Sequence, residues 1–447
     1  MEWLALQGLI IISLPLIVMV LLKKSVLRAS ILTLAYTLTV FLLTNGINSL
    51  REALLNGLVT GLQISSIIFS TIYFYNIQRE LGLENRLKLI LGSSTSSNIF
   101  IAVFFSGFIE SVSGYGVSSA VTAPLLLTAG LEPAVAVTGA VIGHTWAVPF
   151  ASIGIPTMVL ASAAGVNSEQ LAKLTAILGS LSLAAIMLSL SAKYIPTGAK
   201  TLAVGLALAA FLAVSSQLVG IYSAAVFGLV GVVVGLLLSK GFKGVLETCR
   251  VLRYYLLLVS LLLIASALGF GGLRYAFLTV LVAAAITQVL EKRVAKSAVK
   301  RTVSMTANSI LSVVLFAVVA ELVRRGGYMR SLAELIAATT GFFYVLLVPV
   351  VGGLGAYATG SATTSNMVFS TLQKRYAEAV GLDPMKVLAL QNVGGGLGGM
   401  ISPAKIAVAT STVGGRDLEP EVFKEGFKVF VCAVAPQVAV ALVLRLL

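Results

Sequence analysis

Long apolar stretches, separated by short basic or turn-forming segments, make up most of the chain. A helix needs about 20 apolar residues to cross the hydrocarbon core of a membrane. The 447 residues therefore allow roughly a dozen crossings with short loops. The pattern predicts an all-α polytopic membrane protein with roughly 12 transmembrane helices in one transporter domain, residues 1–447. Simple spans are expected at about 3–22, 26–44, 53–76, 170–192, 198–214, 219–239, 251–268, 274–290, 303–322, 333–351 and 424–446.

Two stretches depart from this simple pattern, residues 92–165 and 352–415. Both are hydrophobic enough to lie inside the membrane, yet both are rich in Gly, Ser, Thr and Pro, and their apolar runs are short. Backbone that leaves a helix loses its internal hydrogen bonds, and at membrane depth this is tolerated only against protein or a water-filled cavity. We therefore predict re-entrant or broken helices in both stretches.

The two stretches also share an order of features. In each, an apolar run ends in a polar glycine cluster, a Gly-Leu-acid-Pro turn follows (residues 130–133 and 381–384), and an interrupted helix closes the unit. This order predicts an internal duplication, with repeat 1 at about 53–165 and repeat 2 at about 303–415. We favour inverted repeats, which commonly build a midplane site, although inversion places the basic residues near 324–330 outside, against the charge rule.

Composition agrees with a membrane protein, since 58% of the residues are hydrophobic and 11% are charged, against about 25% charged in soluble domains. The net charge is +14. The basic residues lie in short loops, as after the first span at Lys23, Lys24 and Arg28, which indicates membrane orientation with an outward N-terminus rather than nucleic-acid binding. The first run has the length of a full span, not of a signal peptide.

Several function classes are excluded by missing motifs. The chain contains no GxxxxGK[ST] sequence, which argues against an ATP-driven pump. One histidine and two distant cysteines, Cys249 and Cys432, form neither a metal-ligand cluster nor a disulfide framework. We see no nucleophile–base pair and expect neither enzyme activity nor a cofactor.

Glu110 is the strongest candidate for chemistry in the first polar stretch. It is the one carboxylate inside the broken segment, and an ionisable group at membrane depth is a functional candidate that could take up and release a proton. Around it, glycines and hydroxyls could expose backbone N–H groups to an anion, or could simply form a packing hinge. The candidates here are Glu110, Ser111, Ser113, Gly114, Tyr115, Gly116, His144 and Thr145. His144 could relay protons near neutral pH or could be structural.

Hydroxyl and amide side chains crowd the second polar stretch. They could bind a carboxylate or replace water around a cation, or they could mediate helix packing. The candidates here are Gly360, Ser361, Thr363, Thr364, Ser365, Asn366, Ser402 and Lys405. Lys405 could pair with an anionic substrate or reach toward the membrane surface.

Several of these motifs, taken together, resemble the L-lactate permease family. They are Gly107-Phe-Ile-Glu-Ser-Val-Ser-Gly-Tyr-Gly116, Ala151-Ser-Ile-Gly-Ile-Pro156, Thr359-Gly-Ser-Ala-Thr-Thr-Ser-Asn366 and Met400-Ile-Ser-Pro403 with Ile406-Ala-Val408. The resemblance implies proton-coupled uptake of lactate, glycolate or related 2-hydroxy acids across the plasma membrane, by inverted repeats with re-entrant hairpins.

The sequence departs from this family at three places in the expected site. Ala362 stands where the family has an acidic residue, Gly399 stands where it has a lysine, and residues 110–116 read Glu-Ser-Val-Ser-Gly-Tyr-Gly instead of Glu-Gly-Ala-Ala-Gly-Phe-Gly. An acid and a base are lost together, and Lys405 is a nearby candidate to supply the positive charge.

The function predicted from the sequence is symport of lactate, or a related small 2-hydroxy monocarboxylate, with H⁺ in the plasma membrane. The carboxylate would be held by backbone N–H groups, hydroxyls and Lys405, and Glu110 would carry the proton. A Na⁺-coupled carrier of another organic anion and a passive anion channel remain alternatives. The expected partners are the substrate, H⁺ or Na⁺ and the lipid bilayer, without nucleic acid, and a homo-oligomer is compatible with the sequence.

Overall fold

The computed structural model describes residues 2–18, 22, 26–82, 86, 98–114, 117–270, 273–413 and 418–443, and every regular element in these ranges is a helix. The α-helices are α1 (Glu2–Leu16), α2 (Val26–Glu80), α4 (Asn98–Phe100), α5 (Ser106–Ser113), α6 (Val117–Thr128), α7 (Pro133–Gly143), α8 (Ala151–Ala164), α9 (Ser168–Lys193), α10 (Ala199–Val219), α11 (Ser223–Ala267), α12 (Leu273–Leu290), α13 (Ala298–Gly326), α14 (Tyr328–Thr340), α15 (Val348–Thr359), α16 (Ala362–Ala379), α17 (Pro384–Leu397), α18 (Pro403–Thr412) and α19 (Glu419–Val443). Short turns of other helix types are η3 (Ile101–Phe105), η4 (Thr145–Phe150), η5 (Gly220–Tyr222), η6 (Gly341–Leu347) and η7 (Gly398–Ile401).

The number of complete membrane spans is lower than the roughly 12 expected. Among the described residues, seven helices are long and apolar enough to cross a membrane, or up to eight if the bent pair in α13 counts as one span. The spans expected at 3–22 and 274–290 correspond to shorter apolar helices, within α1 and α12. The spans expected at 219–239 and 251–268 lie in one helix, α11, which is kinked at Gly241 (φ 65°).

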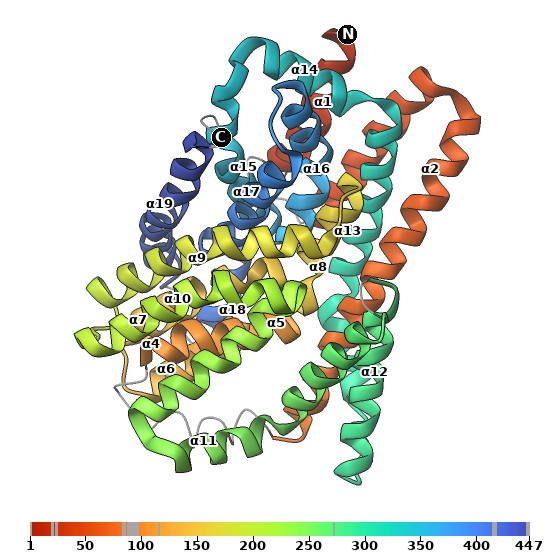
Figure 1. Cartoon of the computed structure of the whole chain (residues 1–447). Helices are drawn as coiled ribbons and strands as arrows, with labels where there is room; N and C mark the ends of the chain where they lie inside the picture. The colour runs from red at the N-terminus through yellow and green to blue at the C-terminus, as the bar shows by residue number, and fades with distance from the viewer. Residues whose placement is uncertain are drawn as a thin grey trace.

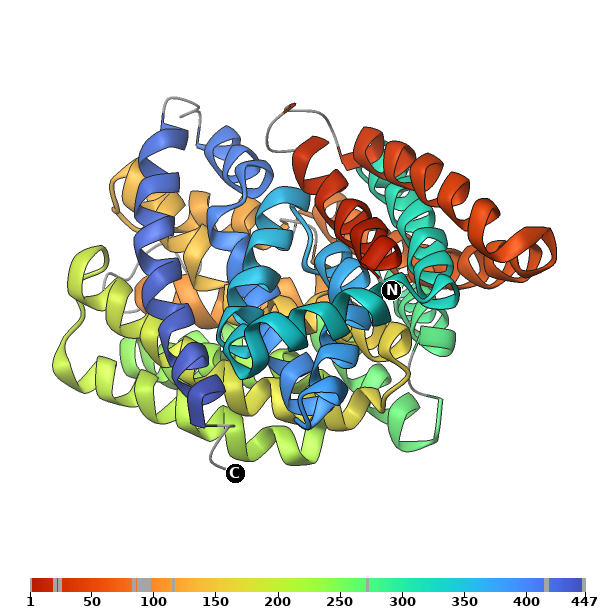
Figure 2. The same ribbon diagram turned by 90° about the horizontal axis from the view of Figure 1, so that it is seen from above.

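Helices α2 and α13 pack closely against each other (Figures 1 and 2). A Cβ atom at Gly57 would lie 2.6 Å from Val318 Cα, and one at Gly61 would lie 2.8 Å from Val314 Cα. This Gly-x-x-x-Gly spacing lets two backbones approach at the membrane interior. The residue number rises along α2 as it falls along α13, so the two helices run antiparallel.

Each polar stretch folds into a pair of helices joined at a glycine, followed by a broken helix. Gly114 (φ 66°) ends α5 before α6, and Gly360 (φ 70°) ends α15 before α16. The broken helices are α7–η4–α8 and α17–η7–α18. The predicted interruptions are therefore present in both stretches. Backbone with positive φ at Gly114 and Gly360 makes the joints between paired helices, whereas extended backbone at Ser402, before Pro403, interrupts the second broken helix.

The second half of each broken helix packs against the other polar stretch, α8 against α16 and α18 against α6. Asn366 Nδ2 donates to the Pro156 carbonyl at 3.1 Å, and Lys374 Nζ donates to the Ala164 carbonyl at 2.7 Å. Both bonds join residues that are 210 positions apart, so α8 and α16 run parallel, in register.

Three consecutive residues make the break at the start of α8. Ser152, Ile153 and Gly154 have φ values of 45°, 67° and 86°. Left-handed backbone is unusual for a β-branched residue such as isoleucine and costs on the order of 1–3 kcal/mol. The surrounding packing must impose it, and strain of this kind is concentrated at functional sites.

An aromatic cluster fixes η4 beside the break. The ring of Trp146 lies 5.5 Å from that of Phe227 and 6.4 Å from that of Phe104, in edge-to-face contacts. Its indole Nε1 donates to the Val103 carbonyl at 3.1 Å. Gly107 is needed here, since a Cβ atom would lie 2.5 Å from the indole ring. This core holds His144, the residue before η4, in place.

Candidate functional site

Three ionisable side chains from separate helices meet inside the protein. Lys405 Nζ, in α18, lies 3.4 Å from Glu110 Oε1, in α5, and 3.5 Å from His144 Nε2, at the end of α7. Glu110 is 1% exposed, His144 is 0% exposed and Lys405 is 8% exposed. Ionisable groups are this deeply buried only when they are paired, and the structure pairs the two charged candidates from the two polar stretches.

The hydrogen bonds of His144 define which ring nitrogen carries the proton. His144 Nδ1 lies 2.8 Å from the Ala140 carbonyl oxygen, which can only accept. Nδ1 must therefore carry the hydrogen, and in the neutral ring Nε2 is the acceptor. Nε2 faces Lys405 Nζ, so His144 accepts from the ammonium group and holds it toward Glu110.

The position of Lys405 makes a negative partner necessary. It lies in the first turn of α18, which begins at Pro403 after the N-cap Ser402. The N-terminus of a helix carries a partial positive charge, so a cation is unfavourable there. Glu110 Oε1 compensates this charge, while Glu110 Oε2 is buried without a hydrogen-bond partner in the described part of the chain. The pair therefore has unused capacity on its carboxylate side.

A small cavity of about 40 Å³ opens beside the Glu110–Lys405 pair. It is lined by Glu110, Val148, Ala151, Ser152, Ile155, Pro156, Gly360, Ser361, Ala362, Thr363 and Lys405. Residues 151–156 lie at the N-terminus of α8, and residues 360–363 lie at the N-terminus of α16. Two helix N-termini therefore face the cavity. Helix N-termini bind anions through their free N–H groups and their dipoles. One lysine and two helix ends thus supply positive potential to the cavity, and Glu110 balances the charge of the lysine in the empty site.

Gly399 leaves the room that Lys405 occupies. A Cβ atom at position 399 would lie 3.1 Å from Lys405 Nζ, so any side chain there would press on the ammonium group. The resemblance implied a lysine at this position. The structure places the ammonium of Lys405 directly over the glycine instead.

Some of the predicted site residues use their hydroxyls elsewhere. Ser111, Ser113 and Thr145 donate to the carbonyls of Phe108, Ile109 and Ile142 within their own helices, at 2.6, 2.5 and 2.7 Å. None of the three lines the cavity beside Glu110. Hydroxyls in helices often bond back to the preceding turn. Tyr115 and Gly116 lie outside the described residues.

The predicted residues at the start of α16 divide into cavity lining and support. Gly360, Ser361 and Thr363 line the cavity. Ser361 Oγ also caps α16 by accepting from the Thr364 N–H at 3.2 Å. Ser365 Oγ donates to the Gly352 carbonyl at 2.8 Å, which ties α16 to α15. Predicted residues Gly114 and Ser402 lie at the breaks that flank Glu110 and Lys405.

A buried amide network behind the cavity was missed from the sequence. Asn366 Nδ2 donates to Asn392 Oδ1 at 2.9 Å, and Asn392 Nδ2 donates to Thr157 Oγ1 at 2.8 Å and to Thr175 Oγ1 at 3.1 Å. The network joins α16, α17, α8 and α9. The signal was the Gln391-Asn392 pair inside an otherwise apolar run. The network holds the start of α8, and with it the cavity wall, in register with α16.

Ser152 was also missed as a site residue. Its hydroxyl donates to the Ser113 carbonyl at 2.9 Å, and the residue lines the cavity. It joins the break of α8 to the end of α5, and a Cβ atom at Gly114 would lie 2.2 Å from its Oγ. The motif that contains Ser152 stands out in the sequence, but its left-handed backbone is not visible there. Among the described residues, no three His, Cys, Asp or Glu side chains group as metal ligands.

Comparison with known proteins gives the family. A sequence model of L-lactate permease matches residues 5–250 and 259–447. An L-lactate permease of Halalkalibacterium halodurans is 25% identical over 427 residues, which cover 81% of each chain. An L-lactate permease of Bacillus subtilis is 40% identical over 116 residues, which cover 26% of this chain and 20% of that protein. The glycolate permease GlcA of Escherichia coli is 36% identical over 115 residues, again 26% and 20% of the two chains.

A solved structure shares the fold. Neisseria gonorrhoeae MtrF, described as representing a class of antimetabolite efflux pumps, superposes with a TM-score of 0.55 at 10% sequence identity, over 94% of this chain and 95% of that chain. At this identity the likeness concerns the fold alone. The family match extends over nearly the whole sequence. The chain therefore belongs to the L-lactate permease family, and it is a multi-pass transporter of the plasma membrane and not an enzyme.

Proposed function

We propose that this protein is a secondary active transporter that carries lactate, or a related small 2-hydroxy monocarboxylate, together with a proton. The observation that carries the proposal is the buried Lys405–Glu110 pair beside a cavity that faces the N-termini of α8 and α16. Relatives of the chain are named as L-lactate and glycolate permeases. Both of those substrates carry a hydroxyl group next to a carboxylate.

The substrate carboxylate would bind where positive potential converges. Lys405 Nζ offers a charge-assisted hydrogen bond, and the N–H groups that open α8 and α16 offer further donors. The hydroxyls of Ser361 and Thr363 line the same cavity and can bond the substrate's 2-hydroxyl group, since a hydroxyl both donates and accepts. These groups suit a small polar acid better than an apolar one.

Coupling to a proton follows from the exchange of one carboxylate for another at Lys405. In the empty site the ammonium pairs with Glu110. When a substrate carboxylate takes Lys405, Glu110 is left as a buried charge without its partner, which is costly by several kcal/mol. Uptake of a proton by Glu110 removes that cost. The empty site, Lys405 cation with Glu110 anion, and the loaded site, cation with substrate anion and neutral Glu110, then both carry no net charge.

This charge balance prevents transport of the anion alone. A site that holds the substrate and an ionised Glu110 has one uncompensated negative charge, and buried uncompensated charges are strongly disfavoured. Only the empty form, and the form that holds both the substrate and the proton, can then switch between opening to the outside and opening to the inside of the membrane. The proposed coupling thus needs one cation, one acid and a dry site.

We also propose that residues 53–165 and 303–415 are inverted repeats that alternate access to this site. Two features support the proposal. The first helices of the two units, within α2 and α13, pack antiparallel, as expected for units related by an axis in the membrane plane. The later helices pack reciprocally, α8 on α16 and α18 on α6.

Uptake into proteoliposomes tests the function. With an acidic exterior, the wild type should accumulate lactate above its external concentration, and Glu110→Gln should bind lactate without accumulating it. Glu132→Gln is the matched control, because Glu132 is exposed and should leave accumulation unchanged. Accumulation by Glu110→Gln under the same pH difference would contradict the role of Glu110. A requirement for Na⁺ that K⁺ does not meet would indicate a Na⁺-coupled carrier, and flux without saturation would indicate a channel.

A further inference from the structure

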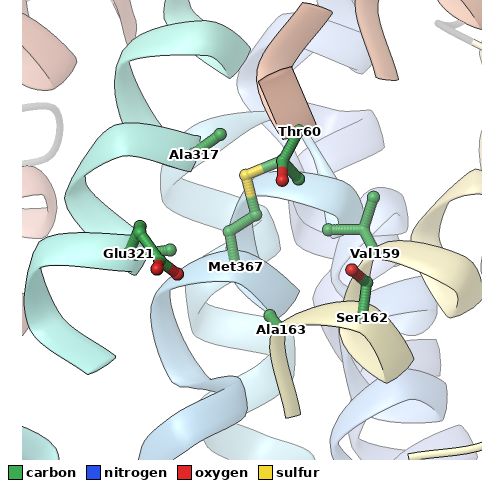
Figure 3. Close-up of a pocket in the computed structure, with 8 residues that line it drawn as sticks. Thr60, Val159, Ser162, Ala163, Ala317, Glu321 and Met367 are labelled. Carbon is green, nitrogen blue, oxygen red and sulfur yellow. The ribbon is translucent and has the colours of Figure 1, made fainter. Parts of the chain in front are cut away.

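A second cavity, of about 70 Å³, lies between the α2–α13 pair and the α8–α16 pair. It is lined by Thr60, Val159, Ser162, Ala163, Ala317, Ala320, Glu321 and Met367. Figure 3 shows the side chain of Met367 at the centre of this group, extended toward Thr60, with Glu321 on one side and Ser162 and Ala163 on the other. Nothing in the proposed binding chemistry uses these residues.

The second cavity shares two walls with the first. On α8, Ile155 lines the cavity beside Glu110 and Val159 lines the second cavity. On α16, Thr363 lines the first and Met367 lines the second. Each pair is four residues apart, so its members lie on the same helix face, about 6 Å apart along the axis. Because α8 and α16 run parallel in register, these faces form one continuous wall from the first cavity to the second.

The second cavity has an apolar floor and a polar mouth. Val159, Met367 and Ala317 are 3%, 4% and 5% exposed, and they form its floor. Ser162 is exposed and Ala163 and Glu321 are partly exposed, and these three residues form its mouth. Thr60 lies beside the tip of Met367, away from Glu321 (Figure 3). On α8, Val159 lies between Ile155 of the first cavity and the mouth residues Ser162 and Ala163, so the floor separates the site from the mouth.

Charged residues mark the mouth as the end that meets water. Glu321 Oε1 accepts from Arg325 Nε at 2.8 Å, and Glu52 Oε2 accepts from Arg325 Nη1 at 2.8 Å. The side chain of Glu52 is 69% exposed, as expected beyond the hydrocarbon region. The linked Glu321, Arg325 and Glu52 thus place this end of the α2–α13 pair at the membrane surface.

From this arrangement we infer that the two cavities are consecutive parts of one passage for the carboxylate substrate, and that Val159 and Met367 form the constriction between them. The inference rests on the proposed function. Val159 and Met367 close the site from water, which keeps the Glu110–Lys405 pair dry. A change of rotamer at the unbranched Met367, or a small shift of α8 and α16 against α2 and α13, opens the passage. Thr60 and Ser162 supply hydroxyls to a hydrated anion on its way.

The first experiment obstructs the mouth. Ala320→Phe places an aromatic ring in the second cavity, and Ala307→Phe is the matched control on the same helix, since Ala307 is exposed and does not line it. We expect Ala320→Phe to lower the initial rate of lactate uptake into proteoliposomes at least tenfold. Detergent-solubilised Ala320→Phe should bind lactate with the Kd of the wild type. Uptake within twofold of the wild type would overturn the inference, as would loss of binding together with uptake.

The second experiment keeps the protein folded while the passage is blocked. Ala163→Cys is made in a chain with Cys249→Ser and Cys432→Ser and is treated with a negatively charged, membrane-impermeant methanethiosulfonate reagent. We expect modification to abolish uptake and dithiothreitol to restore it. Complete modification without loss of uptake, or a position that the reagent cannot reach from either side, would overturn the passage. Absence of lactate uptake by the wild type would instead overturn the proposed function.

Discussion

Replacement of Lys405 by methionine removes the buried cation while keeping a side chain of similar length. Lys405 Nζ lies 3.4 Å from Glu110 Oε1, and two unit charges at that distance attract by about 5 kcal/mol at an effective dielectric constant of about 20. Glu110 is 1% exposed, so water does not replace the lost partner. Breaking a buried pair in this way costs about 3–5 kcal/mol, and we expect Lys405→Met to lower the free energy of unfolding by that amount near pH 8.

The loss of unfolding free energy caused by Lys405→Met should be smaller in acid. In acid, a proton can neutralise the carboxylate that has lost its cation, and a neutral buried carboxyl group costs less than a buried charge without a partner. A folded state that binds more protons than the unfolded state loses stability as the pH rises. We therefore expect the loss of stability caused by Lys405→Met to be smaller near pH 5 than near pH 8.

Denaturant titration of the protein in mixed micelles, at both pH values, measures these free energies. Glu110→Gln combined with Lys405→Met removes both charges and should recover at least half of the loss seen near pH 8. Lys193→Met is the control, because Lys193 pairs with Glu425 but its side chain is 54% exposed, and such pairs contribute at most about 1 kcal/mol. An equal loss at both pH values, or a double variant no more stable than Lys405→Met, would refute the reasoning.

Three further variants test the packing around the site and the scaffold. Gly399→Ala brings a Cβ atom 3.1 Å from Lys405 Nζ and should slow lactate uptake about tenfold through displacement of the ammonium group, at a cost in stability below about 1 kcal/mol. Gly57→Ala places a Cβ atom 2.6 Å from Val318 Cα and should destabilise the protein by about 1–3 kcal/mol. Gly179→Ala is the control for Gly399→Ala and Gly57→Ala. It has no atom within 4 Å of the added Cβ and should be neutral or stabilising. His144→Leu removes the acceptor of Lys405 and should cost about 1–3 kcal/mol in denaturant titration, whereas Thr145→Val, which removes a hydroxyl bonded to its own helix, should cost about 1 kcal/mol or less.

The lengths of the apolar segments predicted the helices, and the few charged residues inside apolar sequence indicated the candidate site. Glu110, His144 and Lys405 could each be singled out because an ionisable group at membrane depth is costly. Their meeting could not be predicted, since Glu110 and Lys405 are 295 positions apart in the sequence and only the packing of α5, α7 and α18 brings them together. The assignment to the L-lactate permease family is confirmed by the family match.

The sequence was less informative about hydroxyl groups and about the number of spans. Whether Ser111, Ser113 and Thr145 face a ligand or bond their own helix depends on rotamers, which spacing does not fix. The expectation of roughly 12 spans counted apolar segments as crossings. Short arms and broken helices are equally apolar, because protein surrounds them as lipid surrounds a full span.

The parallel pairing of α8 with α16 has a consequence for the synthesis of the protein on the ribosome. Lys374 bonds the Ala164 carbonyl, and Asn366 bonds the Pro156 carbonyl, in each case from 210 residues further along the chain. At about 5–20 residues per second, translation delivers these partners roughly 10–40 s after α8 has left the ribosome. During that interval the strained break at Ser152–Gly154 lacks the neighbour that it has in the finished protein. Insertion factors, water or lipid head groups must contact this break until the second half of the chain arrives.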